Sequence, residues 1–327
     1  MAESNTKPKF AFYWAASCGG CEITVTELGM RLVDAGDLVD IVFWPCAMDF
    51  KYEDVEAMAD GEIDFCFFNG AIRTSENEDL AKLLRRKSKV LVAFGSCAHE
   101  GCIPGLANLY DAESILERVY NTVPSLDESR GTRPVPLSKV PEGEIHIPSF
   151  YDQVKTLAQT VDVDYFMPGC PPVVDQVWNV FQLILSGQLP PKGSVIGADA
   201  KTNCDVCPRQ KVQSGMRIKE FKRPHEVELD PDLCFLAQGV ICYGPATRAG
   251  CGLPCIQGNM PCRGCYGPPE GVVDQGAKLL SAIAALIDTD EPEELQSIMD
   301  SIVDLVGTCY RFSLADSILS ELKYKKR

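Results

Sequence analysis

The sequence predicts an α/β protein in which a doubly wound parallel sheet is followed by a cysteine-rich irregular region and by C-terminal helices. Three observations lead to this fold class. Short apolar runs alternate with helical patterns through the first 190 residues, which is typical of parallel strands joined by crossover helices. Gly and Pro then cluster at residues 186–193. Eight of the sixteen cysteines follow, between Cys204 and Cys265.

Five apolar runs have the length and composition of buried strands, and they are residues 9–15, 38–44, 64–69, 89–94 and 161–167. Apolar residues at three and four spacing predict helices between them, at residues 22–33, 76–86 and 173–186. This alternation predicts a flavodoxin-like layer structure. The proline-containing segment 124–148 interrupts the pattern, and we expect it to form an ordered surface excursion over the sheet.

The Gly and Pro cluster predicts a boundary near residue 190, which gives a flavodoxin-like domain at residues 1–190. Residues 191–271 form a Cys-rich domain with too little apolar periodicity for a core of its own, so bound metal is expected to supply cohesion. Residues 272–327 form a C-terminal helical extension that covers or docks. Its helices are expected at residues 272–288, at 292–306 with Asp290 as cap, and at 313–323.

Composition and charge exclude several classes of protein. With 46% hydrophobic and 24% charged residues, the chain of 327 residues is globular rather than disordered. A formal net charge of −15 leaves no basic surface for phosphate, so nucleic acid is not an expected partner. No run approaches the ~20 apolar residues that a bilayer span needs, and residues 1–9 are too short and polar for a secretory signal. We therefore expect a cytoplasmic protein without a membrane span.

Cysteines converge at one edge of the predicted sheet. With no sign of an oxidising compartment, metal binding is the leading interpretation of sixteen cysteines. The cysteines that follow the first, fourth and fifth predicted strands are Cys18, Cys21, Cys97 and Cys170. The carboxyl ends of parallel strands line one crevice, so these four thiolates can hold either one zinc ion or one 4Fe-4S cluster. Flanking glycines leave room for a bulky group and favour the cluster.

Eight further cysteines are enough for two more four-ligand sites. They are Cys204, Cys207, Cys234, Cys242, Cys251, Cys255, Cys262 and Cys265. Structural zinc sites share the C-x-x-C spacing and remain an alternative, whereas several clusters in a row would conduct electrons. The other four, Cys46, Cys66, Cys102 and Cys309, are predicted to be buried as small hydrophobic residues. Among them, Cys102 lies five residues after Cys97, and its assignment stays open.

Over residues 8–270 the chain resembles the small, electron-transferring subunit of NiFe hydrogenases. The motifs that carry the resemblance stand at residues 14–22, 94–98, 163–172, 207–209, 242–251 and 261–265. The resemblance implies that Cys18, Cys21, Cys97 and Cys170 bind a proximal 4Fe-4S cluster that faces a NiFe centre in a partner large subunit. It further implies a distal 4Fe-4S cluster on Cys204, Cys207, Cys234 and Cys242. A medial cluster would lie on Cys251, Cys255, Cys262 and Cys265.

Two departures from the periplasmic members place the chain nearer a cytoplasmic group. Those members have a His at the position of Cys204 and only three cysteines at the medial site, where Cys255 here offers a fourth thiolate. Added thiolate charge predicts low-potential 4Fe-4S clusters throughout. No twin-arginine signal is present. The chain looks most like the small subunit of the methyl-viologen-reducing hydrogenase that works with heterodisulfide reductase in methanogens.

The function implied by this resemblance is relay of electrons from dihydrogen oxidation to a ferredoxin-like iron–sulfur or flavin acceptor subunit, linked to heterodisulfide reductase. No residue of this chain is expected to be catalytic and no FMN is expected in it. Glu22, next to Cys21, is a candidate proton relay, although a carboxylate at a helix start also suits the helix dipole. Two alternatives stay open, namely the same relay beside a large subunit without nickel, and a zinc-stabilised scaffold.

Overall fold

The computed structural model describes residues 7–127, 131–211, 217–287 and 289–321. Its centre is a five-stranded sheet in the order β2-β1-β3-β5-β9, in which every neighbouring pair is parallel. The strands are β1 (Lys9–Trp14), β2 (Asp40–Phe43), β3 (Ile63–Asn69), β5 (Ser88–Phe94) and β9 (Tyr165–Met167). Numbered within the sheet, this is the flavodoxin order 2-1-3-4-5, so the predicted fold class is confirmed.

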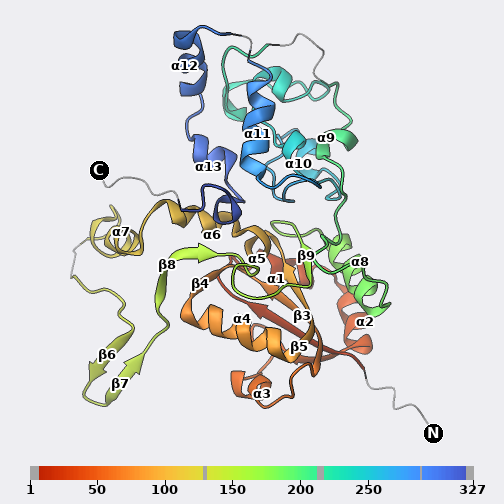
Figure 1. Cartoon of the computed structure of the whole chain (residues 1–327), viewed down its shortest axis with the longest axis vertical. Helices are drawn as coiled ribbons and strands as arrows, with labels where there is room; N and C mark the ends of the chain where they lie inside the picture. The colour runs from red at the N-terminus through yellow and green to blue at the C-terminus, as the bar shows by residue number, and fades with distance from the viewer. Residues whose placement is uncertain (1–6, 128–130, 212–216, 288, 322–327) are drawn as a thin grey trace.

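Helices cover both faces of the sheet because successive side chains of a strand point to opposite sides. Phe65 and Phe67 of β3 pack toward α1 (Gly20–Thr26), α2 (Met30–Leu38) and α8 (Val174–Leu185). Cys66 and Phe68 pack toward the other face, which is covered by α3 (Tyr52–Glu56) and α4 (Ser75–Lys87). Two apolar layers therefore hold the sheet and fix the edge at which its strands end (Figure 1).

The helix predicted over residues 22–33 is wrong as one element. The chain forms α1 and α2 instead, and the break lies at Gly29, whose φ of 59° is outside the helical region. Apolar spacing alone does not register this glycine, because the spacing continues across it. A left-handed residue nevertheless ends one helix and redirects the chain into the next.

The proline-containing excursion forms small antiparallel pairs beside the sheet. Strand β8 (Phe150–Lys155) pairs with β4 (Ile72–Thr74). Strands β6 (Leu137–Val140) and β7 (Gly143–His146) form an exposed hairpin that stands away from the molecule (Figure 1). Short helical turns connect this region to the sheet, and they are α5 (Ser96–Glu100), α6 (Cys102–Gly105), η1 (Leu106–Leu109), α7 (Ala112–Glu117) and η2 (Arg118–Thr122).

The second half of the chain lies on one side of the sheet domain, at the top of Figure 1. Its α-helices are α9 (Asn203–Val206), α10 (Pro254–Gln257), α11 (Gln275–Ala284), α12 (Pro292–Asp300) and α13 (Leu305–Cys309). The 3-10 turns are η3 (Pro224–Glu226), η4 (Leu236–Gln238), η5 (Gly244–Ala246) and η6 (Leu314–Asp316). The Cys-rich segment and the C-terminal helices share one apolar core that includes Phe235, Leu279 and Leu314. No described helix has the length and apolar character to cross a membrane.

Two expectations for the C-terminal helices are wrong. The helix predicted over residues 292–306 is two helices, because Asp304 caps a new start by accepting a hydrogen bond from the Gly307 N–H at 2.9 Å, and Glu291 rather than Asp290 precedes α12. The described part of the predicted helix 313–323 holds only η6, since residues 312–315 are all buried and a surface helix would bury only one face. The ends of the ranges 272–288 and 313–323 lie outside the described residues.

Asp164, just before β9, closes the sheet edge with charged hydrogen bonds. Burial alone would raise the pKa of its carboxyl, but hydrogen bonds from Lys192, Arg85 and the Leu91 N–H lower it below the ordinary value. A lowered folded-state pKa adds stability above the unfolded value, near pH 4, and that stability disappears as pH falls through the folded pKa.

We predict that Asp164→Asn destabilises the protein by about 2 kcal/mol at pH 7, because the charge-assisted bonds from Arg85 and Lys192 are lost. Thermal unfolding of wild type and variant from pH 7 to pH 3 checks this. The gap should be constant down to about pH 4 and should close below it. A gap that widens at acid pH would be the opposite of this expectation.

Candidate metal centres

Four predicted ligands lie together at the carboxyl ends of the strands, and we call them the strand-end group: Cys18, Cys21, Cys97 and Cys170. Cys18 follows β1, Cys21 lies in α1, Cys97 lies in α5 and Cys170 follows β9. Burial raises the pKa of the Cys21 thiol, and the neighbouring thiols of Cys97, Cys170 and Cys18 raise it further. Cys18 is exposed, whereas Cys21 and Cys97 are buried. The fold thus gathers residues from three strand ends, as the topology predicts.

Backbone approaches the sulfur atoms closely in this group. The Gly20 N–H donates to Cys18 Sγ at 3.4 Å. Gly95 has a φ of 82°, and a Cβ at this position would lie 2.5 Å from Cys21 Sγ. The chain therefore needs glycine at residue 95 both for its left-handed backbone and for the space that the sulfur occupies.

Cys102 is a fifth thiol beside the strand-end group. It is fully buried, as predicted, and its Sγ donates to Cys170 Sγ at 3.5 Å, a contact that lowers the pKa of Cys170. A hydrogen bond with Cys97 is also present, and the φ of Cys102 is 46°, unusual for a residue with a side chain. Its position five residues after Cys97 was the only sequence signal for this placement.

The other cysteines outside the predicted ligand sets divide differently from the expectation. Cys66 and Cys309 are fully buried, as predicted. The prediction for Cys46 is wrong, because this residue is exposed. It lies in a turn that follows β2, where Pro45 ends the strand, so no second layer covers it.

The second set of predicted ligands, the middle group, consists of Cys251, Cys255, Cys262 and Cys265. All four line one cavity of about 340 Å³, and Cys170 of the strand-end group lines it as well. Burial raises the pKa of the Cys262 thiol to about 11, while N–H donors from Gly264 and Asn203 lower it. The Asn203 Nδ2 donates to Cys262 Sγ at 3.3 Å. Cys255 is the exposed member of the group.

The third set, the outer group, consists of Cys204, Cys207, Cys234 and Cys242. Burial raises the pKa of the Cys204 thiol to about 12, with further increases from Cys234 and Cys207. Burial likewise raises the pKa of Cys242 to about 12, and Cys204 is among its neighbours. A Cβ on Gly244 would lie 2.7 Å from Cys204 Sγ, so backbone again passes close to sulfur.

The three groups follow one another in a row. Cys265 of the middle group interacts electrostatically with Cys170 of the strand-end group and accepts a hydrogen bond from its backbone N–H. Cys262, also of the middle group, raises the pKa of both Cys204 and Cys242 in the outer group. The middle group therefore lies between the other two.

Hydrogen bonds fix the middle group against the sheet domain. The Ser96 Oγ donates to the Cys265 carbonyl at 2.6 Å. The Tyr266 hydroxyl donates to Gln176 Oε1 at 2.5 Å and accepts from the Val173 N–H at 3.2 Å. Because Ser96 and Cys97 are adjacent in α5, this network sets the strand-end and middle groups in one rigid arrangement.

Charged residues near the groups have mainly structural partners. Arg209 donates to the carbonyls of Asp230 and Leu233, each at 2.8 Å, so it holds the loop that carries Cys234. Glu22 is buried and accepts from Trp44 Nε1 at 2.7 Å. Burial raises the pKa of the Glu22 carboxyl to about 7, and the Trp44 bond acts in the opposite direction. A proton-relay role for Glu22 stays a prediction.

The donor chemistry of all three groups fits iron–sulfur clusters. The predicted ligands are thiols alone, and backbone N–H groups of Gly20, Gly244, Gly264 and Cys170 donate to them. Hydrogen bonds of this kind tune cluster potentials. Among the described residues, no three His, Cys, Asp or Glu side chains are close enough together to hold a single metal ion.

A flavodoxin-like sheet with rows of thiols at its strand ends defines the class of electron-transfer iron–sulfur proteins. A family model described as "NADH ubiquinone oxidoreductase, 20 Kd subunit" matches residues 18–184. The iron–sulfur subunit of the F420-non-reducing hydrogenase of Archaeoglobus profundus is 40% identical, over 97% of this chain and 99% of that one. The corresponding subunit of the F420-non-reducing hydrogenase of Methanothermobacter marburgensis is 36% identical over 100% and 99%.

This chain belongs to that family, in its branch of hydrogenase small subunits, and the resemblance inferred from the motifs is confirmed. It is a subunit of a hydrogenase, an oxidoreductase complex whose catalytic centre lies in the large subunit. Among solved structures, a [NiFeSe] hydrogenase chain from Desulfovibrio vulgaris Hildenborough matches with a TM-score of 0.50 and 17% identity, over 82% of this chain and 96% of that one. At this identity the likeness shows the fold alone.

Proposed function

We propose that this chain carries three 4Fe-4S clusters in a row, between the NiFe centre of the large subunit and an acceptor subunit. The observation that carries the proposal is the order of the three cysteine groups, with Cys265 beside Cys170 and Cys262 beside Cys204 and Cys242. The strand-end group would hold the proximal cluster, the middle group the medial cluster and the outer group the distal cluster. Domain limits of 1–190, 191–271 and 272–327 are proposed with this assignment.

A 4Fe-4S cluster, when bound, accepts and releases single electrons. The chain's own residues do the rest. They bury most of the sulfur ligands, so water is largely kept away, and their backbone N–H groups donate to thiolate sulfur. Both factors set the reduction potential of such a site.

The proximal edge is the surface that we propose for the large subunit. Cys18 is exposed there, and the apolar side chains of Trp14, Ile23 and Met30 are 39%, 59% and 75% exposed around α1 and α2. Permanent subunit interfaces bury apolar surface of this kind, typically more than about 2,000 Å² in total. Covering this edge would also exclude water from the strand-end group.

The acceptor proposed for the outer group is an iron–sulfur or flavin subunit of a heterodisulfide reductase type of complex. Support comes from two relatives whose names describe hydrogenases that do not reduce F420, so their electrons leave toward another acceptor. Low potentials at thiolate-only sites agree with a ferredoxin-like acceptor. The expectation of a cytoplasmic location stays a prediction.

The exposed Cys255 offers a direct test of the medial assignment. We predict that Cys255→Ala converts the medial site from four irons to three, because only Cys251, Cys262 and Cys265 would remain as thiolates. Redox-titrated EPR spectroscopy of the anaerobically purified complex should then show a 3Fe-4S signal that wild type lacks. A 3Fe-4S signal already present in wild type, or an unchanged variant spectrum, would contradict the assignment of Cys255.

The proposed function is tested with the purified complex under dihydrogen and an oxidised viologen dye. Dihydrogen-dependent dye reduction is expected, together with brown colour and bound nickel in the large subunit. A brown complex without nickel and without this activity would favour a relay beside a nickel-free large subunit. Colourless protein with bound zinc would leave a structural scaffold as the correct interpretation.

A further inference from the structure

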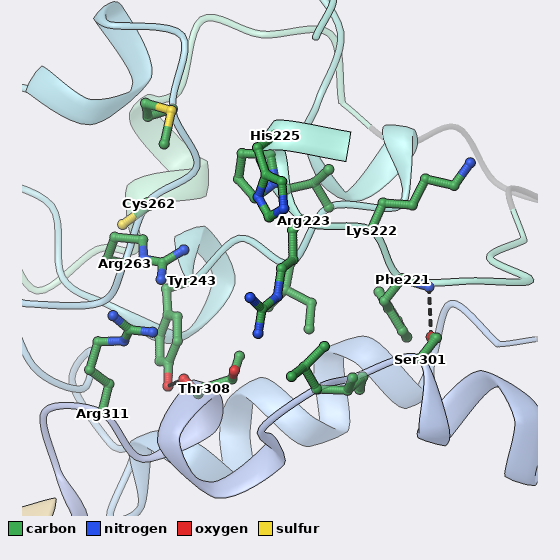
Figure 2. Close-up of a pocket in the computed structure, with 16 residues that line it drawn as sticks. Phe221, Lys222, Arg223, His225, Tyr243, Cys262, Arg263, Ser301, Thr308 and Arg311 are labelled. Atoms are coloured by element: carbon green, nitrogen blue, oxygen red, sulfur yellow. Dashed lines mark hydrogen bonds between the residues drawn. The ribbon is translucent and has the colours of Figure 1, made fainter. Parts of the chain in front are cut away.

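A cavity of about 570 Å³ opens beside the cysteine-rich segment, and neither the family nor the cysteine groups assign it a role. Residues 221–225 form one wall, and residues from α12 to α13 form another (Figure 2). Three arginines, Arg223, Arg263 and Arg311, line it, and we call it the arginine pocket. His225 lies on the same wall as Arg223.

The arginine pocket contains positive charge without a matching negative charge. None of its lining residues is acidic. Among the described residues, none of the three guanidinium groups has a hydrogen bond or ion pair, whereas Arg209 nearby has three hydrogen bonds. This stands out in a chain with a formal net charge of −15, in which carboxylates are common.

Arg263 and Arg311 are both half-buried and lie on either side of the Tyr243 ring (Figure 2). Their like charges repel each other, and partial burial weakens the screening of that repulsion by water. Arg223 extends from the opposite wall into the middle of the cavity (Figure 2). An anion in this space would contact cations from three separate segments and would relieve the repulsion.

The walls of the cavity are held in place by their own hydrogen bonds. The Tyr243 hydroxyl donates to the Thr308 carbonyl at 2.7 Å. The Phe221 N–H donates to Ser301 Oγ at 2.9 Å, as the dashed line in Figure 2 shows. Val240 and Ile302 add a buried apolar surface next to the arginines. Preformed cavities of about 300–1,000 Å³ with an apolar wall and a few polar groups are typical sites for small organic ligands.

We propose that the arginine pocket binds a phosphate-bearing organic anion of nucleotide size. Planar guanidinium groups match phosphate oxygens with paired hydrogen bonds, and three converging arginines suit a diphosphate better than a single carboxylate. The apolar wall formed by Val240 and Ile302 would take the uncharged part of the ligand. This inference does not depend on the electron-transfer proposal.

The test measures binding of ADP, pyrophosphate and citrate to the anaerobically purified complex by isothermal titration calorimetry. ADP is expected to bind more tightly than pyrophosphate, because only ADP has a part that reaches the apolar wall. Citrate, a carboxylate anion of similar charge, is expected to bind at least about tenfold more weakly than pyrophosphate. Equal binding of citrate and pyrophosphate would overturn the phosphate assignment.

Charge-reversal variants locate the site. Arg223→Glu and Arg311→Glu should each weaken ADP binding by about tenfold or more, whereas Arg311→Lys, which keeps the charge, should weaken it less. The matched control is Lys219→Glu, an exposed position in the neighbouring segment that does not line the cavity. Iron content reports whether each variant is folded.

Three results would overturn the proposal. The first is absence of ADP and pyrophosphate binding to the wild-type complex at millimolar concentration. The second is loss of binding in Lys219→Glu equal to that in Arg223→Glu, which would indicate only diffuse charge attraction. The third is a pocket filled by an acidic segment of a partner subunit in a structure of the complex. None of these results bears on whether the three cysteine groups hold clusters.

Discussion

Replacing Cys21 by alanine should remove one complete cluster and almost all dihydrogen-dependent dye reduction. The Cys21 thiol lies among Cys18, Cys97 and Cys170, so its loss leaves three of the four ligands proposed for the proximal cluster. Iron should fall from about twelve to about eight per chain. Because loss of a neighbour of a metal ligand already costs 10–100-fold in affinity or activity, activity should fall at least about 100-fold. Iron analysis and viologen reduction under dihydrogen measure both effects.

The matched control for this prediction is Cys66→Ala. Cys66 is also fully enclosed, but it lies in β3 and packs against the opposite layer of the sheet. Its replacement should cost about 1 kcal/mol of stability through a small cavity and should leave the iron content unchanged. Equal iron content in Cys21→Ala and Cys66→Ala would show that Cys21 binds no cluster.

Gly95→Ala is expected to have nearly as large an effect, although it removes no ligand. The φ of Gly95 is 82°, which strains a residue with a side chain, and the added Cβ would lie 2.5 Å from Cys21 Sγ. The sulfur or the backbone must therefore move. We expect a melting temperature lower by at least about 5 °C and loss of the proximal iron, measured by thermal unfolding and iron analysis.

Gly187→Ala separates backbone strain from displacement of the sulfur. Gly187 has a similar φ of 69°, but no atom lies within 4 Å of the position that its Cβ would take. This variant should lose only about 1 kcal/mol of stability and should keep all its iron. Loss of iron in Gly187→Ala as large as in Gly95→Ala would mean that general destabilisation, not contact with Cys21, empties the site.

The sheet and its cysteine-bearing edge were predictable from the sequence because both follow from periodicity and topology. Apolar runs of strand length mark the buried strands, and parallel strands place their carboxyl ends at one edge. Cys18, Cys97 and Cys170 therefore converge without any need to know side-chain geometry. The elements that were wrong lie where local backbone decides, as at Gly29 and Asp304, because hydrophobic spacing carries no information about φ.

Cys102 and the arginine pocket illustrate what spacing cannot give. Cys102 reaches the strand-end group because Gly101 and Cys102 both take a left-handed backbone, which no apolar pattern indicates. Arg223, Arg263 and Arg311 are far apart in the chain and meet only when the C-terminal helices fold over the cysteine-rich segment. Tertiary packing, rather than local sequence, creates both features.

The most direct test of the central claim is the content of iron, acid-labile sulfide and zinc in the anaerobically purified complex, read together with Mössbauer spectra. After subtraction of the large subunit's iron, the account predicts about twelve irons and about twelve sulfides per chain, all in 4Fe-4S form, and no stoichiometric zinc. Zinc in place of iron, or iron enough for only one cluster, would contradict it.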